Sequence, residues 1–514
     1  MKKRVFSIQS RNLSRSKKAY ISTITAFALQ VVNIIAALVV PRIIITNFGS
    51  EANGLINSIA QFLGYISFLQ MGVGGVYKAA LYKPLAFGDT KQISRIVKAS
   101  EEFFKKIGYI SLVYVAILAC SFPYFSDSTF DFIYTASMVV VIAISTVAQY
   151  VWGFTYQDLL IADQRGYIQS IIIIVSTIAN TVLTIVLANF GASLHVIKLV
   201  SASVFVINPL LLRGICKRYY KIDKSVEADT AAIKQRWNGL FHSFADFVHR
   251  KTDVFMLTVL ATLKDVSVYS VYAVVLNGLT AIIGIISGPF MAAMGNMLAK
   301  KEEHAVRESV RVYMFITHYV CSVVFSVAIL MILPFIKLYT QGVNDANYLH
   351  GTFAVLLITA ELIGCLKGPY ISLVGAAGHY KQTKLGPILE AGINLILSVL
   401  LVRKYHIVGV AIGTLVGMSV GTIYFIWYTK HNIIHMDYTV SLKRYAISAV
   451  SILLITLLGK QIHISVVTAF DWVCAAVVFT IMAAIITTGM NFIFYKSDMQ
   501  NTITKVLRVI GLRK

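Results

Sequence analysis

The chain has 514 residues, of which 57% are hydrophobic and only 13% are charged. A water-soluble protein of this length cannot bury so much apolar surface, so the composition excludes the soluble enzyme and binding-protein classes. The formal charge of +23 is also no sign of nucleic-acid binding, because Lys and Arg are concentrated in short segments between apolar runs, as in the cytoplasmic loops of membrane proteins.

Apolar runs of about 20 residues recur along the chain, and each is long enough to cross the hydrocarbon core of a bilayer as a helix. Breaking these runs at Gly, Pro and charged clusters predicts about 14 transmembrane helices. They are expected at 20–40, 54–77, 104–124, 131–155, 167–188, 194–213, 239–262, 266–291, 311–336, 350–374, 384–402, 406–428, 442–459 and 468–494. The even number and the basic N-terminal stretch predict that both termini are cytoplasmic.

The order of the predicted helices repeats at an offset of roughly 214 residues, which places Asn180 opposite Asn394. We therefore expect an all-α polytopic fold with two six-helix bundles, related by a pseudo-two-fold axis along the membrane normal, and two further helices. The expected parts are a basic cytoplasmic N-terminus (1–19), the N-terminal bundle (20–213), a basic cytoplasmic linker (214–238), the C-terminal bundle (239–428), the two additional helices (429–495) and a basic amphipathic cytoplasmic tail (496–514).

Short segments in both halves of the chain carry a family resemblance. The first half contains Pro41-Arg42, FGSEANGL at 48–55, MGVG at 71–74 and LYKPLAFGD at 81–89, and the second contains TDV at 252–254 and VYSVY at 268–272. These segments resemble the bacterial Wzx-type polysaccharide flippases of the multidrug/oligosaccharidyl-lipid/polysaccharide (MOP) exporter superfamily. The acidic residue that this family commonly has before the glycine of the second helix is absent, because Gln70-Met71 occupies that place.

The resemblance implies two bundles around a central cavity that opens alternately to each side of the bacterial inner membrane. The implied cargo is a polyprenyl-diphosphate-linked oligosaccharide, moved to the outer leaflet for surface polysaccharide assembly. The expected partners are membrane lipids, a polysaccharide polymerase and glycosyltransferases. The sequence has no G-x-x-x-x-G-K-[ST] phosphate loop and no metal or catalytic motif, so we expect no enzyme activity, cofactor or metal. In place of ATP hydrolysis, an ion gradient, the membrane potential or downstream consumption of the substrate would drive transport, and H⁺ and Na⁺ are the candidate coupling ions.

The seventh predicted helix has the densest group of ionisable side chains in any span. Four of them share one face at spacings of four, three and four: His242, Asp246, His249 and Asp253. Ionisable groups at this depth cost several kcal/mol unless they face protein, water or one another, so we expect this face to line the cavity. There Arg250 and Lys251 would bind the diphosphate, and Asp253, Asp246 or His249 would bind a coupling cation. Alternatively, Asp246 with Arg250 and His249 with Asp253 only neutralise one another.

Other polar residues in predicted spans are further candidates. Lys367 and Arg42 are cationic candidates for the cavity, although Arg42 near a helix end can also extend its guanidinium into the interface. Glu361, close to the middle of a span, is a candidate polar group of the cavity. Four amides are candidates for contact with sugar hydroxyls, and helix-to-helix hydrogen bonding is the alternative for them: Gln30, Asn33, Asn57 and Gln61.

Two other transport functions remain open. One is a flippase for the lipid-linked peptidoglycan precursor, and the other is a cation-coupled multidrug (MATE-like) exporter. An exporter of organic cations needs an acidic cavity, whereas Arg250, Lys251 and Lys367 favour an anionic cargo. A peptidoglycan-precursor flippase would share the number of helices and the cationic cavity, so the residues do not separate it from the first hypothesis.

Overall fold

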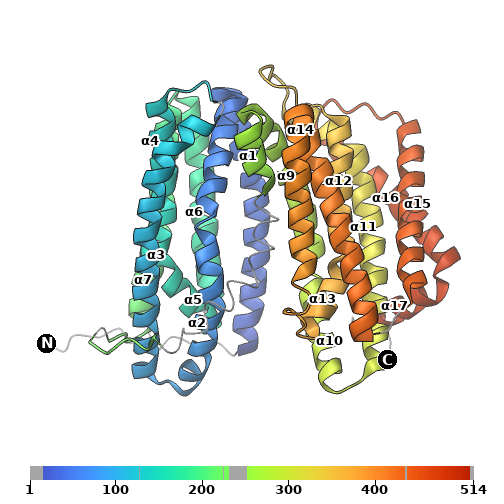
Figure 1. Cartoon of the computed structure of the whole chain (residues 1–514), viewed down its shortest axis with the longest axis horizontal. Coiled ribbons are helices and arrows are strands. Elements are labelled where there is room, and N and C mark those ends of the chain that lie inside the picture. The colour runs from blue at the N-terminus through green and yellow to red at the C-terminus, as the bar shows by residue number, and fades with distance from the viewer. Residues whose placement is uncertain (1–14, 127, 224, 231–251, 435–436, 510–514) are drawn as a thin grey trace. The chain divides into compact units, whose positions relative to one another are not determined.

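The computed structural model describes residues 15–126, 128–223, 225–230, 252–434 and 437–509, and all regular elements within these ranges are helices (Figure 1). Eleven helical segments of the described chain are long and apolar enough to cross a membrane. Two of the eleven contain a non-helical residue, Gly49 and His406, and therefore comprise two helices each. The expected all-α polytopic fold is confirmed.

The chain divides into two compact units. The first unit comprises Met1–Asn47, Phe62–Tyr124 and Thr129–Ser243, and the second comprises Phe48–Gln61, Phe125–Ser128 and Phe244–Lys514. Phe48–Gln61 thus packs within the second unit, although its neighbours in sequence belong to the first.

The first unit consists mainly of long helices: the first arm of α1 (Arg15–Gly64), α2 (Ser67–Phe87), α3 (Thr90–Phe125), α4 (Phe132–Ala148), the π-helical turn η1 (Gln149–Gly153), α5 (Phe154–Ala162), α6 (Gly166–Asn189) and α7 (Leu194–Tyr219). Gly88, with a left-handed φ of 68°, ends α2, and the Ser193 hydroxyl caps the start of α7. Large apolar side chains such as Phe104 and Phe122 fill its core.

The second unit contains helical residues 252–260, α9 (Leu263–Gly284), α10 (Ser287–Ala299), α11 (Glu303–Tyr339), α12 (Gly351–Leu366), α13 (Gly368–Ala376), α14 (Leu385–Thr429), the π-helical turn η3 (Lys430–Ile434), α15 (Tyr438–Gln461), α16 (Ala469–Phe494) and α17 (Lys496–Val509). Capping boxes start α9 and α16, where Thr262 pairs with Asp265 and Thr468 with Asp471.

Helix α14 is a hairpin of two arms that meet at His406, which has a φ of 48° and ψ of −128°. The imidazole Nδ1 of His406 lies 3.0 Å from Oδ2 of Asp265. This contact stabilises the unusual backbone conformation of His406. The second arm has a glycine at every fourth position: Gly409, Gly413, Gly417 and Gly421. A Cβ at Gly413 would lie only 2.5 Å from Ser398 Oγ, so the glycines allow the two arms to pack at backbone contact.

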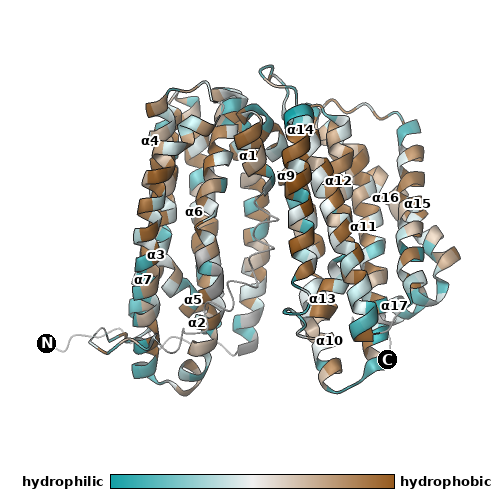
Figure 2. Ribbon diagram, in the orientation of Figure 1, coloured by the Kyte–Doolittle hydropathy of each residue, from teal (hydrophilic) through white to brown (hydrophobic). Residues whose placement is uncertain are grey.

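Hydrophobic residues predominate along the helices, and hydrophilic residues are concentrated near the ends and in the loops (Figure 2). On α15 and α16, for example, Leu453, Leu457, Val477 and Ile485 are exposed. Apolar surface of this extent is stable in lipid, where the helices satisfy their backbone hydrogen bonds internally. The chain is therefore a multi-pass membrane protein.

Candidate functional site

Asp253 is a buried carboxylate in the second unit, with only 8% of the residue exposed. It accepts hydrogen bonds from the Tyr269 hydroxyl at 2.8 Å and the Thr414 hydroxyl at 3.0 Å. The Asn394 amide nitrogen lies 3.4 Å from the other carboxylate oxygen. Hydrogen bonds to the ionised form offset the loss of hydration, so this group of donors from α9 and both arms of α14 stabilises a charge inside the membrane.

Further oxygen atoms adjoin this carboxylate. The Asn394 side-chain oxygen accepts a hydrogen bond from Ser398 at 3.1 Å, and the Thr414 hydroxyl lies 3.0 Å from the carbonyl oxygen of Val410. No group of three His, Cys, Asp or Glu side chains that could hold a metal occurs among the described residues. The hydroxyl and amide groups around Asp253 lack the imidazole and thiolate ligands that transition metals prefer.

Lys367 and Glu390 form a buried ion pair next to this cluster. Lys367 Nζ lies 2.7 and 2.6 Å from the two carboxylate oxygens of Glu390, and the residues are 6% and 4% exposed. Lys367 stands where α12 ends and α13 begins, and Glu390 belongs to the first arm of α14. Gly421 makes room for the pair, because a Cβ there would overlap the Glu390 carboxylate. The charge of this predicted cavity lysine is thus neutralised within the unit.

Glu390 and Asn394 are one helical turn apart, so the ion pair and the Asp253 cluster are adjacent on α14. Glu361, on α12, interacts electrostatically with Tyr269, one of the donors to Asp253. The second unit therefore brings three of the predicted site residues, Asp253, Glu361 and Lys367, into one region. His242, Asp246, His249, Arg250 and Lys251 lie outside the described residues.

The remaining predicted residues lie elsewhere. Arg42 and Gln30 are half-buried on the first arm of α1, and Asn33 on the same arm is exposed. Asn57 and Gln61 belong to the second unit, where Asn57 donates to the backbone oxygen of Asn53 at 2.8 Å. The amide of Asn57 thus bonds within its own helix and also lies 3.4 Å from the Ser270 hydroxyl on α9.

A polar latch that the sequence did not reveal lies at one end of the second unit. The Ser50 backbone N–H and hydroxyl each donate to one carboxylate oxygen of Asp345, both at 2.7 Å. Tyr348 in turn donates to the Ser50 hydroxyl at 2.7 Å and lies 2.9 Å from the Ser267 hydroxyl. Burial raises the pKa of Tyr348, which keeps its hydroxyl neutral and available as a donor. The only sequence signal was the glycine-containing segment at 48–55.

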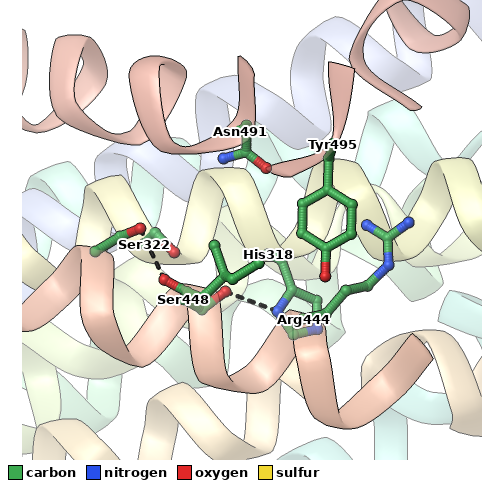
Figure 3. Close-up of a pocket in the computed structure, with 8 residues that line it drawn as sticks. His318, Ser322, Arg444, Ser448, Asn491 and Tyr495 are labelled. Atoms are coloured by element: carbon green, nitrogen blue, oxygen red, sulfur yellow. Dashed lines mark hydrogen bonds between the residues drawn. The ribbon is translucent and has the colours of Figure 1, made fainter. Parts of the chain in front are cut away.

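A small polar cavity lies among α11, α15, α16 and Tyr495, the residue that follows α16 (Figure 3). His318 Nδ1 lies 2.9 Å from the Ser448 hydroxyl, and the buried Arg444 guanidinium pairs with Asp498 and lies 4.8 Å from the centre of the Tyr495 ring. His318 Nε2 and the Tyr495 hydroxyl have no hydrogen-bond partner among the described residues. The cavity has a volume of about 10 Å³, which is room for a water molecule and far less than a ligand pocket needs.

Several solved structures share this architecture. No family model matches the sequence, and no curated protein matches it. Among solved structures, the lipid II flippase MurJ in an inward closed conformation superposes with a TM-score of 0.70 over 93% of this chain and 99% of that chain, at 12% identity. An inward-facing multidrug resistance MATE transporter of the MOP superfamily gives a TM-score of 0.57 over 80% of this chain and 97% of that chain, at 13% identity. The chain therefore has the same fold as these two solved structures.

The eukaryotic MATE transporter AtDTX14 superposes with a TM-score of 0.55 over 85% of this chain and 99% of that chain, at 12% identity. The MATE structures thus leave more of this chain unmatched than MurJ does. These solved structures with the MOP fold are transporters and a flippase, and none of their names describes an enzyme.

Proposed function

We propose that the chain is a Wzx-type flippase, which translocates a polyprenyl-diphosphate-linked oligosaccharide from the cytoplasmic to the outer leaflet of the bacterial inner membrane. The observation that carries the proposal is the extent of the shared fold. A flippase of lipid II superposes over 93% of this chain, whereas the two MATE transporters superpose over 80% and 85%. The larger overlap favours a lipid-linked cargo over a free drug molecule.

The described carboxylates of the second unit also disfavour an organic cation as cargo. Asp253 receives hydrogen bonds from neighbouring side chains, and Glu390 pairs with Lys367. An exporter of cationic drugs needs carboxylates that face the cavity and take their counter-charge from the cargo. Glu390 already takes its counter-charge from Lys367 within the protein.

Transport in this proposal is driven by a cation that binds at Asp253. The side chains of Asp253, Asn394 and Thr414 would hold it, with the carboxylate supplying the negative charge. Because three donors stabilise the ionised carboxylate, Na⁺ suits this site better than H⁺. The chain contains no phosphate loop, so an ion gradient takes the place of ATP hydrolysis.

Lipid II is the second candidate cargo, and the MurJ superposition is the observation that favours it. Both cargos have a diphosphate on a long polyprenyl chain and differ in the sugar. With an oligosaccharide cargo, glycosyltransferases must supply the lipid-linked unit on the cytoplasmic side and a polymerase must consume it outside. We propose these enzymes as partners.

Reconstitution into liposomes with three cargos tests the proposal. A lipid-linked oligosaccharide, lipid II and the cationic dye ethidium are supplied separately, and movement across the bilayer is followed with a lectin, a sugar-modifying enzyme or dye fluorescence. We expect translocation of the lipid-linked oligosaccharide and none of ethidium. Faster movement of lipid II than of the oligosaccharide would mean that lipid II is the cargo. Transport of ethidium alone would refute both proposed cargos.

A further inference from the structure

Three carboxylates in the described helices are more than nine-tenths buried: Asp158, Asp253 and Glu390. Their surroundings differ in one respect that decides whether the group can be charged. Asp253 has hydrogen-bond donors at both oxygens, and Lys367 donates to both oxygens of Glu390. Asp158, on α5 of the first unit, has no comparable set of partners.

Asp158 Oδ2 is buried and has no hydrogen-bond partner among the described residues. The nearest cation, Lys78 Nζ on α2, lies 3.8 Å from the other oxygen, which is beyond hydrogen-bond distance. The Lys78 side chain is itself 30% exposed, so solvent screens its charge. Gly74 closes the remaining side of the carboxyl group, since a Cβ there would lie 3.2 Å from Oδ2.

The other ionisable groups around Asp158 bond to different partners. On α2, the Tyr77 hydroxyl donates to the Thr155 carbonyl oxygen at 3.3 Å. Glu101 on α3 accepts a hydrogen bond from the Tyr156 hydroxyl, and Arg213 on α7 also interacts with Tyr156. The Cys216 thiol, also on α7, lies 3.7 Å from the Tyr156 carbonyl oxygen. Lys78 is therefore the one cation near Asp158 in the described part of the first unit.

A carboxylate that loses its hydration without gaining donors is unstable, and binding a proton removes the charge. We infer that Asp158 is a proton-binding site in the first unit, and that its carboxyl group is protonated in the conformation described here. Release of the proton leaves a carboxylate whose available counter-charge is Lys78. The role in transport rests on the proposed function, in which this proton is exchanged in addition to the cation at Asp253.

Dicyclohexylcarbodiimide tests the protonation directly, because it reacts with protonated carboxyl groups in apolar surroundings. The acid O–H adds across a C=N bond of the reagent, the proton goes to nitrogen, and acyl transfer to nitrogen leaves a stable N-acylurea. The purified full-length protein is treated in detergent without cargo, at mildly acidic and at alkaline pH. Peptide mass spectrometry then locates the added mass of one reagent molecule.

We expect modification at Asp158 that decreases as the pH rises, and none at Asp253 or Glu390. Asp163 provides an internal control five residues away, because Arg165 and the Tyr220 hydroxyl bond to its carboxylate at 2.7 and 2.6 Å. An unmodified Asp158 at acidic pH, or equal modification of Asp158 and Asp163, would overturn the inference. The wild-type protein alone supplies this result, so it does not depend on the folding of a variant.

Two variants refine the test. Asp158→Asn should abolish the modification and also remove a carboxylic-acid C=O band from the infrared spectrum of the wild-type protein. Lys78→Met should increase the modification, because it removes the cation that favours the charged form; a decrease would contradict the inference. Since no cargo is present, modification of Asp158 without transport of lipid-linked oligosaccharide would refute the proposed function alone, and transport without modification would refute this inference alone.

Discussion

Lys367 Nζ donates to both carboxylate oxygens of Glu390, at 2.7 and 2.6 Å, inside the membrane-spanning part of the second unit. Removing one partner of a buried ion pair leaves an uncompensated charge, which costs about 3–5 kcal/mol, whereas replacing both can be neutral. We therefore expect Lys367→Met to lower the free energy of unfolding strongly and the double variant Lys367→Met, Glu390→Leu to recover most of the loss. Unfolding in detergent, followed by circular dichroism, measures both. A loss in the double variant as large as in Lys367→Met would contradict this prediction.

The glycine stripe of α14 gives a second prediction. A Cβ at Gly417 would lie 2.7 Å from the Glu390 carbonyl oxygen, so Gly417→Ala should separate the arms and destabilise the protein by about 1–3 kcal/mol. Gly392 is a matched control on the first arm of the same helix, because no atom lies within 4 Å of a Cβ built there. Thermal unfolding of the two variants side by side is the measurement. A loss in Gly392→Ala as large as in Gly417→Ala would argue against close packing of the arms.

Cation binding at Asp253 gives a third prediction. A ligand that binds only the folded state stabilises it in proportion to the logarithm of its concentration. The wild-type protein should therefore unfold at a higher temperature in NaCl than in choline chloride, and Asp253→Asn should lose this difference. Glu303→Gln is the control, since Glu303 is largely exposed on the first turn of α11. The site would be excluded as a Na⁺ site if Asp253→Asn kept the full Na⁺ effect.

The Ser50 latch gives a fourth prediction. Ser50→Ala removes a hydroxyl that donates to Asp345 and accepts from Tyr348, and bonds to charged groups contribute about 1.5–3 kcal/mol each. We expect a destabilisation of this size in Ser50→Ala. Thr46→Ala is the control, because the exposed Thr46 hydroxyl bonds only to groups of its own helix arm, the backbone oxygens of Arg42 and Ile43 and the side-chain amide of Asn47. An indistinguishable stability of the two variants would mean that the latch contributes nothing.

Much of the fold could be predicted from the sequence because the membrane imposes a simple requirement on it. A helix in lipid needs a long apolar run, and breaks in these runs mark the ends of the helices. Two breaks were predicted in the right regions, between the first and second helices and near His406, where charged and glycine residues interrupt the apolar pattern. Composition and periodicity alone therefore suffice for the fold class.

The candidate site was less accessible to sequence analysis, because its contacts join distant parts of the chain. Asp253 was selected for its charge, but its donors Asn394 and Thr414 are 141 and 161 residues away. The Ser50–Asp345 contact spans 295 residues. A single sequence shows which side chains are polar within a span, whereas the partner that neutralises each of them depends on how the helices pack.

The most direct test of the account is translocation of a lipid-linked oligosaccharide by the purified protein in liposomes under an imposed Na⁺ gradient. We predict that the wild-type protein moves the cargo faster with the gradient than without it, and that Asp253→Asn loses this acceleration while remaining folded. A wild-type rate equal to that of protein-free liposomes would contradict the account.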